Sequence, residues 1–265
     1  MIILKIGGSA LTIKDANKPT IDEINLDRIV KEISVYNQDM IIVHGAGSYG
    51  HIYATEYSIG SKIENEEDNT AKIEGFCKTQ SSVQLLNNIF CSKLQELGVP
   101  AIGLQASSFI TTLDKRIDNC NLDVIKEYLK KGFVPVLYGD PVLDHNDEIK
   151  YAILSGDQII TYLAEKLNPN KVILSSDVDG IYTDNPKTNP NAKLIDIVTK
   201  DTKLSLTDDK NQADITGGMA GKVNELLNLA KYGIESQIIN AEKPGNIELA
   251  VSGQKVKGTI IKWWL

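Results

Sequence analysis

The chain has 265 residues, 42% of them hydrophobic and 24% charged, so it can bury a sizeable core, and its composition excludes disordered, coiled-coil and collagen-like proteins. Its 28 basic and 35 acidic residues give a formal net charge of −7, which argues against general binding to nucleic acid or to a membrane surface, because both require a basic face. An anionic ligand would therefore have to meet lysines that are placed locally.

The first predicted strand covers the apolar residues 2–6 and contains one charged residue, Lys5. It ends in the turn-forming sequence Gly7-Gly8-Ser9. A lysine inside a buried strand is costly unless its ammonium group meets an anion or a carboxylate. Lys5 is therefore a candidate functional residue. Apolar side chains at helical spacing between residues 26 and 33 then predict an amphipathic helix that crosses over to a second, parallel strand.

That second strand, residues 40–43, runs directly into the glycine-rich stretch His44-Gly45-Ala46-Gly47-Ser48-Tyr49-Gly50-His51. Without Cβ atoms at Gly45 and Gly47, backbone N–H groups can approach an anion closely, and a helix that opens just afterwards would direct its positive end there. Glycine-rich turns also occur as plain connections, so this turn alone leaves both interpretations open. Two strand-to-glycine turns, one with an inward lysine, indicate a site for two phosphates.

The middle of the chain predicts an acidic connection at residues 58–69 and then a long helix that ends at Gly98 and Pro100. Strands are expected at residues 100–104 and 133–138, with a short helix near 122–131 between them. Alternating apolar residues between positions 138 and 153 predict a β-hairpin. On the long helix, Phe76, Val83 and Leu86 share one face, and we expect them either to line a pocket for an apolar tail or to be plain core.

The last third of the chain continues the alternation of strands and helices. Residues 155–158 open a helix, a strand follows at 172–174, residues 175–186 form a loop rich in turn formers, and a helix after residues 216–219 contains Lys222. Short strands at 238–239 and 259–261 close the chain. The pattern predicts an α/β fold over residues 1–265, with an open, mostly parallel sheet sandwiched by helices and a small β-hairpin insertion. Ligands of such sheets bind at the carboxyl ends of the strands.

The three cysteines lack CxxC spacing, so we expect neither a disulfide framework nor a zinc site. No apolar run approaches the ~20 residues of a membrane span, and residues 1–7 are too short for a signal peptide. These features favour a cytoplasmic protein.

Three lysines lie next to glycine turns: Lys5, Lys14 and Lys222. Phosphoryl transfer needs cations on the transferring group, because negative charge spreads over its oxygens in the transition state. A solvated surface position remains the alternative, above all for Lys14. Asp157 either caps a helix or holds the ammonium groups of neighbouring lysines in place.

The remaining polar candidates are aspartates and histidines. Asp179 fits a turn-forming role and Asp177 a contact to a nucleotide, and no regular spacing supports a metal site. Of the histidines, His44 is expected to be structural, His145 to be solvated, and His51 to lie on the wall of the phosphate pocket. The glycine stretch has GxGxxG spacing but lacks the acidic partner of a dinucleotide site, which disfavours a dinucleotide enzyme.

Taken together, the sequence motifs resemble the amino acid kinase superfamily and, within it, the isopentenyl phosphate kinases of the archaeal type. The motifs are Lys5-Ile-Gly-Gly-Ser9, His44-Gly-Ala-Gly-Ser-Tyr-Gly-His51, Gly139-Asp140, Ser155-Gly-Asp-Gln158, Ser176-Asp-Val-Asp-Gly-Ile-Tyr-Thr183 and Thr216-Gly-Gly-Met219 with Lys222. The resemblance spans essentially the whole chain. Tyr49, where the family usually has phenylalanine, is a mild departure that affects only the polarity of the pocket.

This resemblance implies ATP and Mg²⁺ as cofactors, a homodimer, and specific roles for the candidate residues. Lys14 matches the family's lysine that stabilises the transition state, and Asp157 matches its aspartate that organises the lysines. An N-terminal lobe, about residues 1–165, would bind the phosphate acceptor, and a C-terminal lobe, about 166–265, would bind ATP. The residues implied for the ATP phosphates are Lys5, Gly7, Gly8, Ser9, Gly47, Gly217 and Lys222, with Asp177, Tyr182 and Thr183 near the nucleoside. Those implied for the acceptor phosphate are Ala46, Gly47, Gly50, His51 and Gly156.

The activity implied by the resemblance is ATP-dependent phosphorylation of isopentenyl phosphate to isopentenyl diphosphate in isoprenoid biosynthesis. Two alternatives remain. The first is a kinase for another small phosphate or phosphonate such as fosfomycin, because related fosfomycin kinases share the histidine of the glycine turn. The second is a non-catalytic nucleotide-binding or storage module on the same fold, which the intact Lys5, Lys14 and Lys222 oppose.

Overall fold

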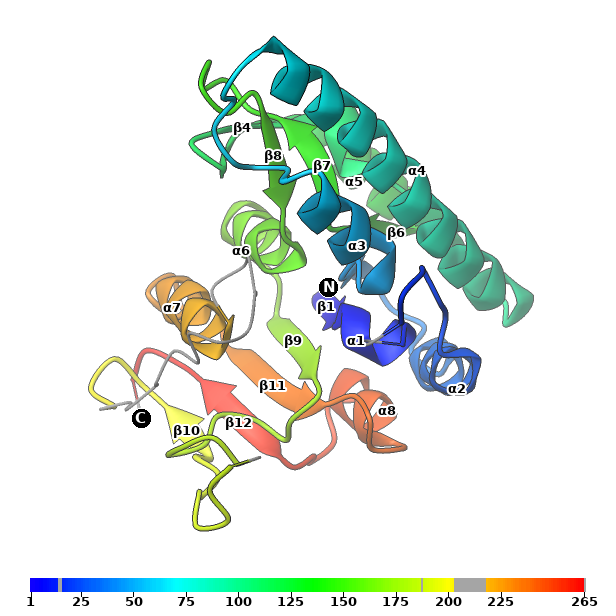
Figure 1. Ribbon diagram of the computed structural model, residues 1–265. Coiled ribbons are helices and arrows are strands. Elements are labelled where there is room, and N and C mark those ends of the chain that lie inside the picture. The colour runs from blue at the N-terminus through cyan, green and yellow to red at the C-terminus, as the bar shows by residue number, and fades with distance from the viewer. Residues whose placement is uncertain (14–15, 187, 203–217, 265) are drawn as a thin grey trace.

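The computed structural model describes residues 1–13, 16–186, 188–202 and 218–264. Within these ranges a central sheet is built from β1 (Ile2–Ile6), β2 (Met40–His44), β3 (Ala101–Gly103), β6 (Val134–Tyr138), β9 (Lys171–Ser176), β10 (Ile197–Val198), β11 (Ser236–Asn240) and β12 (Gly258–Ile261) (Figure 1). The strands lie in the order β10-β12-β11-β9-β1-β2-β6-β3, and all neighbours are parallel except β11 and β12. The predicted open, mostly parallel sheet is confirmed.

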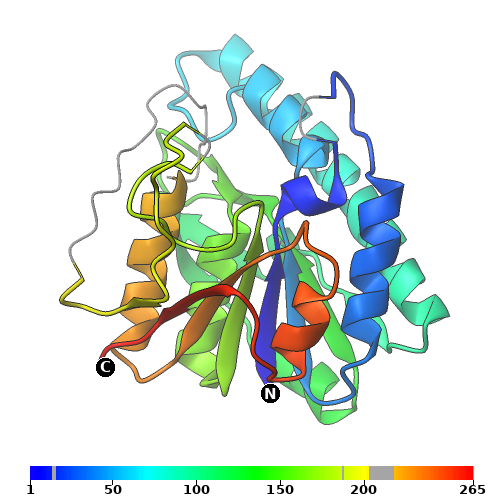
Figure 2. The same ribbon diagram turned by 90° about the horizontal axis from the view of Figure 1, so that it is seen from below.

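Helices flank this sheet on both faces (Figures 1 and 2). They are α1 (Gly8–Leu11), α2 (Glu23–Ser34), α3 (Ser48–Glu56), α4 (Glu66–Glu96), α5 (Asp123–Lys130), α6 (Gly156–Leu167), α7 (Gly218–Ala230) and α8 (Asn246–Val251), with a 3₁₀ turn, η1 (Ala106–Ser108). No helix in the described part of the chain is long and apolar enough to cross a membrane.

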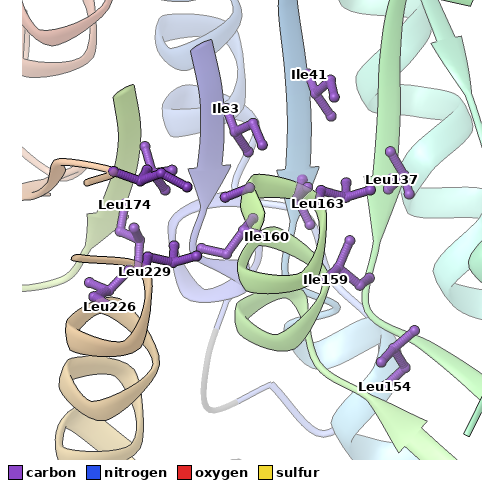
Figure 3. Close-up of a cluster of buried hydrophobic side chains, with 14 of the residues drawn as sticks. Ile3, Ile41, Leu137, Leu154, Ile159, Ile160, Leu163, Leu174, Leu226 and Leu229 are labelled. Carbon is purple, nitrogen blue, oxygen red and sulfur yellow. The ribbon is translucent and has the colours of Figure 1, made fainter. Parts of the chain in front are cut away.

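Two hydrophobic cores form because strand side chains alternate between the faces of the sheet. Ile3 of β1 joins side chains of α6 and α7 in one core (Figure 3), which also contains Ile125 of α5. Its neighbour Leu4 joins side chains of α1, α2, α4 and α8 in the other. Lys5 follows Leu4, so it points to the same face as Ile3, toward α6 and α7.

Two β-hairpins lie outside the main sheet. The hairpin of β7 (Asp140–Leu143) and β8 (Tyr151–Leu154) is the one that the sequence predicted. A second hairpin, β4 (Ile110–Leu113) and β5 (Arg116–Cys120), was not predicted. Its two-residue turn is Asp114-Lys115, and both residues have positive φ without the glycine that usually marks such a turn.

The acidic connection predicted at residues 58–69 is shorter than expected. Asn65 caps α4 by accepting a hydrogen bond from the Asp68 backbone, and Glu66, Glu67 and Asp68 form the first turn of the helix. Acidic side chains are favourable there because the start of a helix carries partial positive charge. The acidity that suggested an exposed loop is therefore a helix-start signal.

The strand ends that carry the glycine turns lie in one row. In the parallel register, Ile6 of β1 is opposite both His44 of β2 and Ser175 of β9, and His44 is opposite Tyr138 of β6. The segments that follow these residues therefore meet at the same edge of the sheet, where ligands of such folds bind.

Candidate active site

A buried aspartate lies between two of the candidate lysines. Lys5 is only 7% exposed, and its Nζ lies 2.8 Å from Oδ1 of Asp157 in the first turn of α6. Nζ of Lys222, on α7, lies 3.8 Å from Oδ2 of the same carboxylate. The alternation of β1 and the contact between α6 and α7 bring the three together from distant parts of the sequence. This arrangement holds two positive charges at the carboxyl edge of the sheet.

The two glycine turns pack backbone to backbone beside this cluster. A Cβ atom on Gly8 would collide with the backbone nitrogen of Gly47 and lie 2.7 Å from its Cα. A Cβ atom on Gly45 would lie 2.6 Å from the nitrogen of Gly8. Gly47 has a φ of +53°, which side chains rarely adopt. Glycine is therefore required at these positions by close approach and, at Gly47, by conformation as well. Gly7, in the first of these turns, donates its N–H to the Ser175 carbonyl at the end of β9 at 3.2 Å.

Helix α3 begins immediately after Gly47, as the sequence predicted, and His51 lies exposed in its first turn. The start of a second helix, α6, is near. A Cβ atom on Gly139 would lie 3.7 Å from the nitrogen of Gly156, the first residue of α6, and 3.8 Å from that of Ala46. Gly50 packs against Ala46. The candidate acceptor residues thus converge on the starts of α3 and α6, where backbone N–H groups favour an anion.

His44 has the structural role that was predicted for it. Its side chain is fully buried, with Nε2 accepting from the Asn87 amide at 3.0 Å and Nδ1 donating to the Gly45 carbonyl at 3.0 Å. Burial lowers the pKa of His44 to about 4, so the ring is neutral at pH 7. The ring also stacks on Tyr138, with 5.4 Å between centroids. Through its hydrogen bond to the Gly45 carbonyl, this neutral histidine helps to hold the glycine turn in place.

The apolar candidates on α4 lie in two environments. Val83 and Leu86 are fully buried in a small cluster with Tyr49 and Tyr138, and Ala46 packs against that cluster. Phe76 is half-buried, and its ring packs edge-on against Tyr151 with 5.9 Å between centroids. Val83 is close to the glycine turn, since a Cβ atom on Gly50 would lie 3.3 Å from its Cγ1. This face of α4 therefore packs beside the proposed acceptor residues.

The loop after β9 carries the candidates for the nucleoside. Asp177 follows the strand directly, Tyr182 forms an isolated bridge with Leu194, and Thr183 is exposed. Because β9 is the neighbour of β1, this loop begins at the edge of the sheet that carries the glycine turns. Lys14 and Gly217, by contrast, lie outside the described residues.

Asp179 has a larger role than the sequence suggested. Its buried carboxylate accepts from Lys243 and Lys257, each at 2.6 Å, and from the Asn240 amide at 3.0 Å. Burial opposes its ionisation, but these three donors outweigh burial and hold the pKa of Asp179 well below its usual range. The sequence gives no signal for this cluster, because the partners follow more than 60 residues later.

No group of three His, Cys, Asp or Glu side chains that could hold a metal ion occurs among the residues that the structure describes.

Comparison with known proteins identifies the family. The model of the amino acid kinase family matches residues 1–240. Isopentenyl phosphate kinase from Methanothermobacter thermautotrophicus is 49% identical, with 98% of each chain covered, and the enzyme of the same name from Methanocaldococcus jannaschii is 37% identical, again with 98% of each chain covered. An X-ray structure of isopentenyl phosphate kinase superposes with a TM-score of 0.89 at 47% identity, over 98% of this chain and 100% of that one. The chain belongs to the amino acid kinase family and, within it, to the isopentenyl phosphate kinases.

Proposed function

We propose that this chain transfers the γ-phosphoryl group of ATP to the phosphate of isopentenyl phosphate, forming isopentenyl diphosphate. The observation that carries the proposal is the cluster of Lys5, Asp157 and Lys222 beside two glycine turns that pack backbone to backbone. Relatives over the full length of the chain carry the name of this activity.

The residues present suit a transfer without a general base. A phosphate monoester has its second pKa near ~6, so at neutral pH the acceptor is already a dianionic nucleophile. The chain must bring two highly charged groups into line and neutralise them. Lys5 and Lys222 supply positive charge, and Asp157 fixes where their ammonium groups lie. Backbone N–H groups at the starts of α3 and α6 supply further donors to the acceptor phosphate.

A magnesium ion fits this site as a companion of the nucleotide. The ammonium and backbone N–H groups of this site are not metal ligands. A magnesium ion would therefore be held here mainly by the phosphates of the nucleotide, because Mg²⁺ is commonly bound by substrate phosphates with one or two carboxylates. When bound, the ion would neutralise charge on the β- and γ-phosphates. We also propose a homodimer, as the family resemblance implies, and a cytoplasmic location, which the sequence analysis favours.

The residue assignments divide the chain into two functional parts. In this proposal the N-terminal part, about residues 1–165, binds the acceptor through the Ala46–His51 turn and Gly156. The C-terminal part, about residues 166–265, binds ATP through Lys222, Gly217 and the loop of Asp177, Tyr182 and Thr183. In this proposal Lys5, Gly8 and Gly47 of the N-terminal part also bind the ATP phosphates, and Lys14 acts on the transferring group.

The proposal is tested by an ATP-consumption assay over small phosphomonoesters and phosphonates. Isopentenyl phosphate should give the highest kcat/KM, and formation of isopentenyl diphosphate should match ADP release. Higher kcat/KM with fosfomycin would identify a phosphonate kinase instead. ATP binding without turnover of any acceptor would indicate a non-catalytic nucleotide-binding or storage module.

His51→Ala is expected to raise the KM for isopentenyl phosphate about tenfold to a hundredfold and to change the KM for ATP little. The imidazole is assigned to the acceptor phosphate alone, and a hydrogen bond to a charged group contributes roughly 1.5–3 kcal/mol. Steady-state kinetics with each substrate varied in turn measures the effect. His145→Ala removes another exposed imidazole, in the β7–β8 connection, and should leave both constants unchanged. Equal rises in both KM values for His51→Ala would contradict the assignment.

Phe76→Ala and Leu86→Ala, made separately, are expected to improve turnover of geranyl phosphate relative to isopentenyl phosphate. Shortening a bulky wall beside the glycine turn admits a longer tail, and each newly buried CH₂ group is worth about 0.8 kcal/mol, or about fourfold. The ratio of kcat/KM for the two acceptors measures the change. Leu94→Ala, farther along α4 in the other core, should lower the melting temperature and keep the ratio. If both test variants behave like Leu94→Ala, these residues are core.

A further inference from the structure

The tip of the β4–β5 hairpin carries a cation that the proposed mechanism does not yet use. Its turn residues, Asp114 and Lys115, have φ values of +51° and +65°, a conformation that persists only where neighbours impose it. Asp144 does so by accepting the backbone N–H groups of Asp114 at 3.1 Å and Lys115 at 2.7 Å. Burial opposes ionisation of Asp144, but the hydrogen bonds that it accepts outweigh burial and lower its pKa. The tip is therefore held in one position.

A second residue ties this tip to the active-site helix. The side-chain amide of Gln158 donates to the Lys115 carbonyl at 3.0 Å, and its oxygen accepts the N–H of Ile117 at 2.7 Å. Gln158 directly follows Asp157 in the first turn of α6. The position of Lys115 is thus fixed relative to the carboxylate that holds Lys5 and Lys222.

Lys115 and Asp157 both line a cavity of about 540 Å³. Its lining also includes Thr55, one helical turn beyond His51 on α3, and Gly221, next to Lys222 on α7. Helices that carry residues proposed for the acceptor, α3 and α6, and a helix that carries a residue proposed for ATP, α7, therefore all contribute to this cavity. It is a place where a phosphate group of either substrate can come within reach of the hairpin tip.

The charges around the cavity favour an anion. Its two carboxylates are already paired, Asp157 with Lys5 and Lys222, and Glu225 with Arg116 at 2.7 Å. No ion pair to Lys115 is recorded within the described ranges. Among the described charged residues that line the cavity, Lys115 is therefore left without an ion-pair partner.

We propose that the ammonium group of Lys115 binds a phosphate group in this cavity, on the acceptor, on ATP or on the group in transfer. The inference deepens the proposed kinase function and rests on it. Asp144 and Gln158 hold the backbone of the turn, so the backbone that carries the lysine is positioned before substrate arrives, which lowers the entropy lost on binding.

The test compares wild type with Lys115→Met, which keeps the length of the side chain and removes its charge, and Lys115→Arg, which keeps the charge. Lys126→Met, at an exposed position on α5, is the control for the same change in net charge. We expect kcat/KM to fall about tenfold in Lys115→Met and to be largely restored in Lys115→Arg. Varying each substrate in turn identifies the phosphate: a rise in the KM of the acceptor, a rise in the KM of ATP, or a fall in kcat alone.

Two results would overturn the inference. In one, Lys115→Met matches Lys126→Met in all three constants. In the other, the loss disappears at 0.5 M salt, which would mean long-range attraction and no contact. Circular dichroism and melting temperature show whether each variant is folded, and Lys115→Gln, which also removes the charge, replaces Lys115→Met if that variant is not. Absence of turnover in wild type would instead refute the proposed function.

Discussion

Asp157→Asn is expected to lower kcat about 100- to 1,000-fold, the usual effect of removing one group from a preorganised charge arrangement, while the KM for ATP stays the same or falls. Asp157 is negatively charged and lies next to the proposed phosphate site. Removing that charge should therefore not weaken the electrostatic attraction of the site for the nucleotide. Its loss leaves Lys5 and Lys222 without the carboxylate that fixes them at 2.8 and 3.8 Å. Repulsion between the two lysines then displaces them from the transferring group, and steady-state kinetics records the fall.

Glu32→Gln provides the control for Asp157→Asn. Glu32 is also a buried carboxylate with an ion-pair partner, Arg28 at 2.7 Å, but it holds α2 against the start of α8. This variant should lose stability and keep its kcat. If Asp157→Asn lowers the melting temperature to the same extent and kcat falls no more than in Glu32→Gln, Asp157 is structural and the proposed organisation of the lysines is wrong.

The sheet, and the edge of it where the candidate residues gather, could be predicted from the sequence because local pattern and physical chemistry agree there. A charged residue in an otherwise apolar strand demands a partner, so Lys5 indicated a buried anion or carboxylate before any geometry was known. Glycines after two parallel strands indicated two turns at the carboxyl edge of the sheet, but only the structure shows that Gly8, Gly45 and Gly47 pack backbone to backbone. The role of Asp157 was harder to predict, because a carboxylate at the start of a helix is commonly explained by capping alone.

The features that the sequence did not reveal depend on contacts between distant residues. The β4–β5 turn lacks the Asn-Gly or Asp-Gly pair that marks such hairpins, and its positive φ values are imposed by Asp144, some 30 residues later. The residues that flank Asp179 in the sequence indicate a turn. Its role as the centre of a buried ion-pair cluster appears only in the fold, which brings Lys243 and Lys257 next to it. Such partners are set by topology, which residue patterns do not report.

Gly8→Ala is expected to lower kcat/KM for both substrates by at least about 100-fold, because a displacement of catalytic groups by about 1 Å can have an effect of that size. The added methyl group would collide with the nitrogen of Gly47 and lie 2.7 Å from its Cα and 3.0 Å from the carbonyl carbon of Gly45. All three atoms are backbone, so neither turn can yield by rotating a side chain. The two turns must separate, and the N–H groups proposed for both substrates move with them. Overpacking of this kind destabilises by about 1–3 kcal/mol, so the melting temperature should also fall by several degrees.

Gly132→Ala separates this collision from an ordinary loss of stability. Gly132 has a φ of +81° with no other atom within 4 Å of an added Cβ, so alanine there is strained without a clash. That variant should lose about 1 kcal/mol of stability and keep wild-type kinetics. Gly8→Ala should instead lose much of its kcat/KM. Measured well below the melting temperature, where the variant is folded, this loss should be far larger than the loss of stability can explain. If the two variants lose similar stability and both retain full activity, the glycine turns do not position the substrates and their close packing serves only the fold.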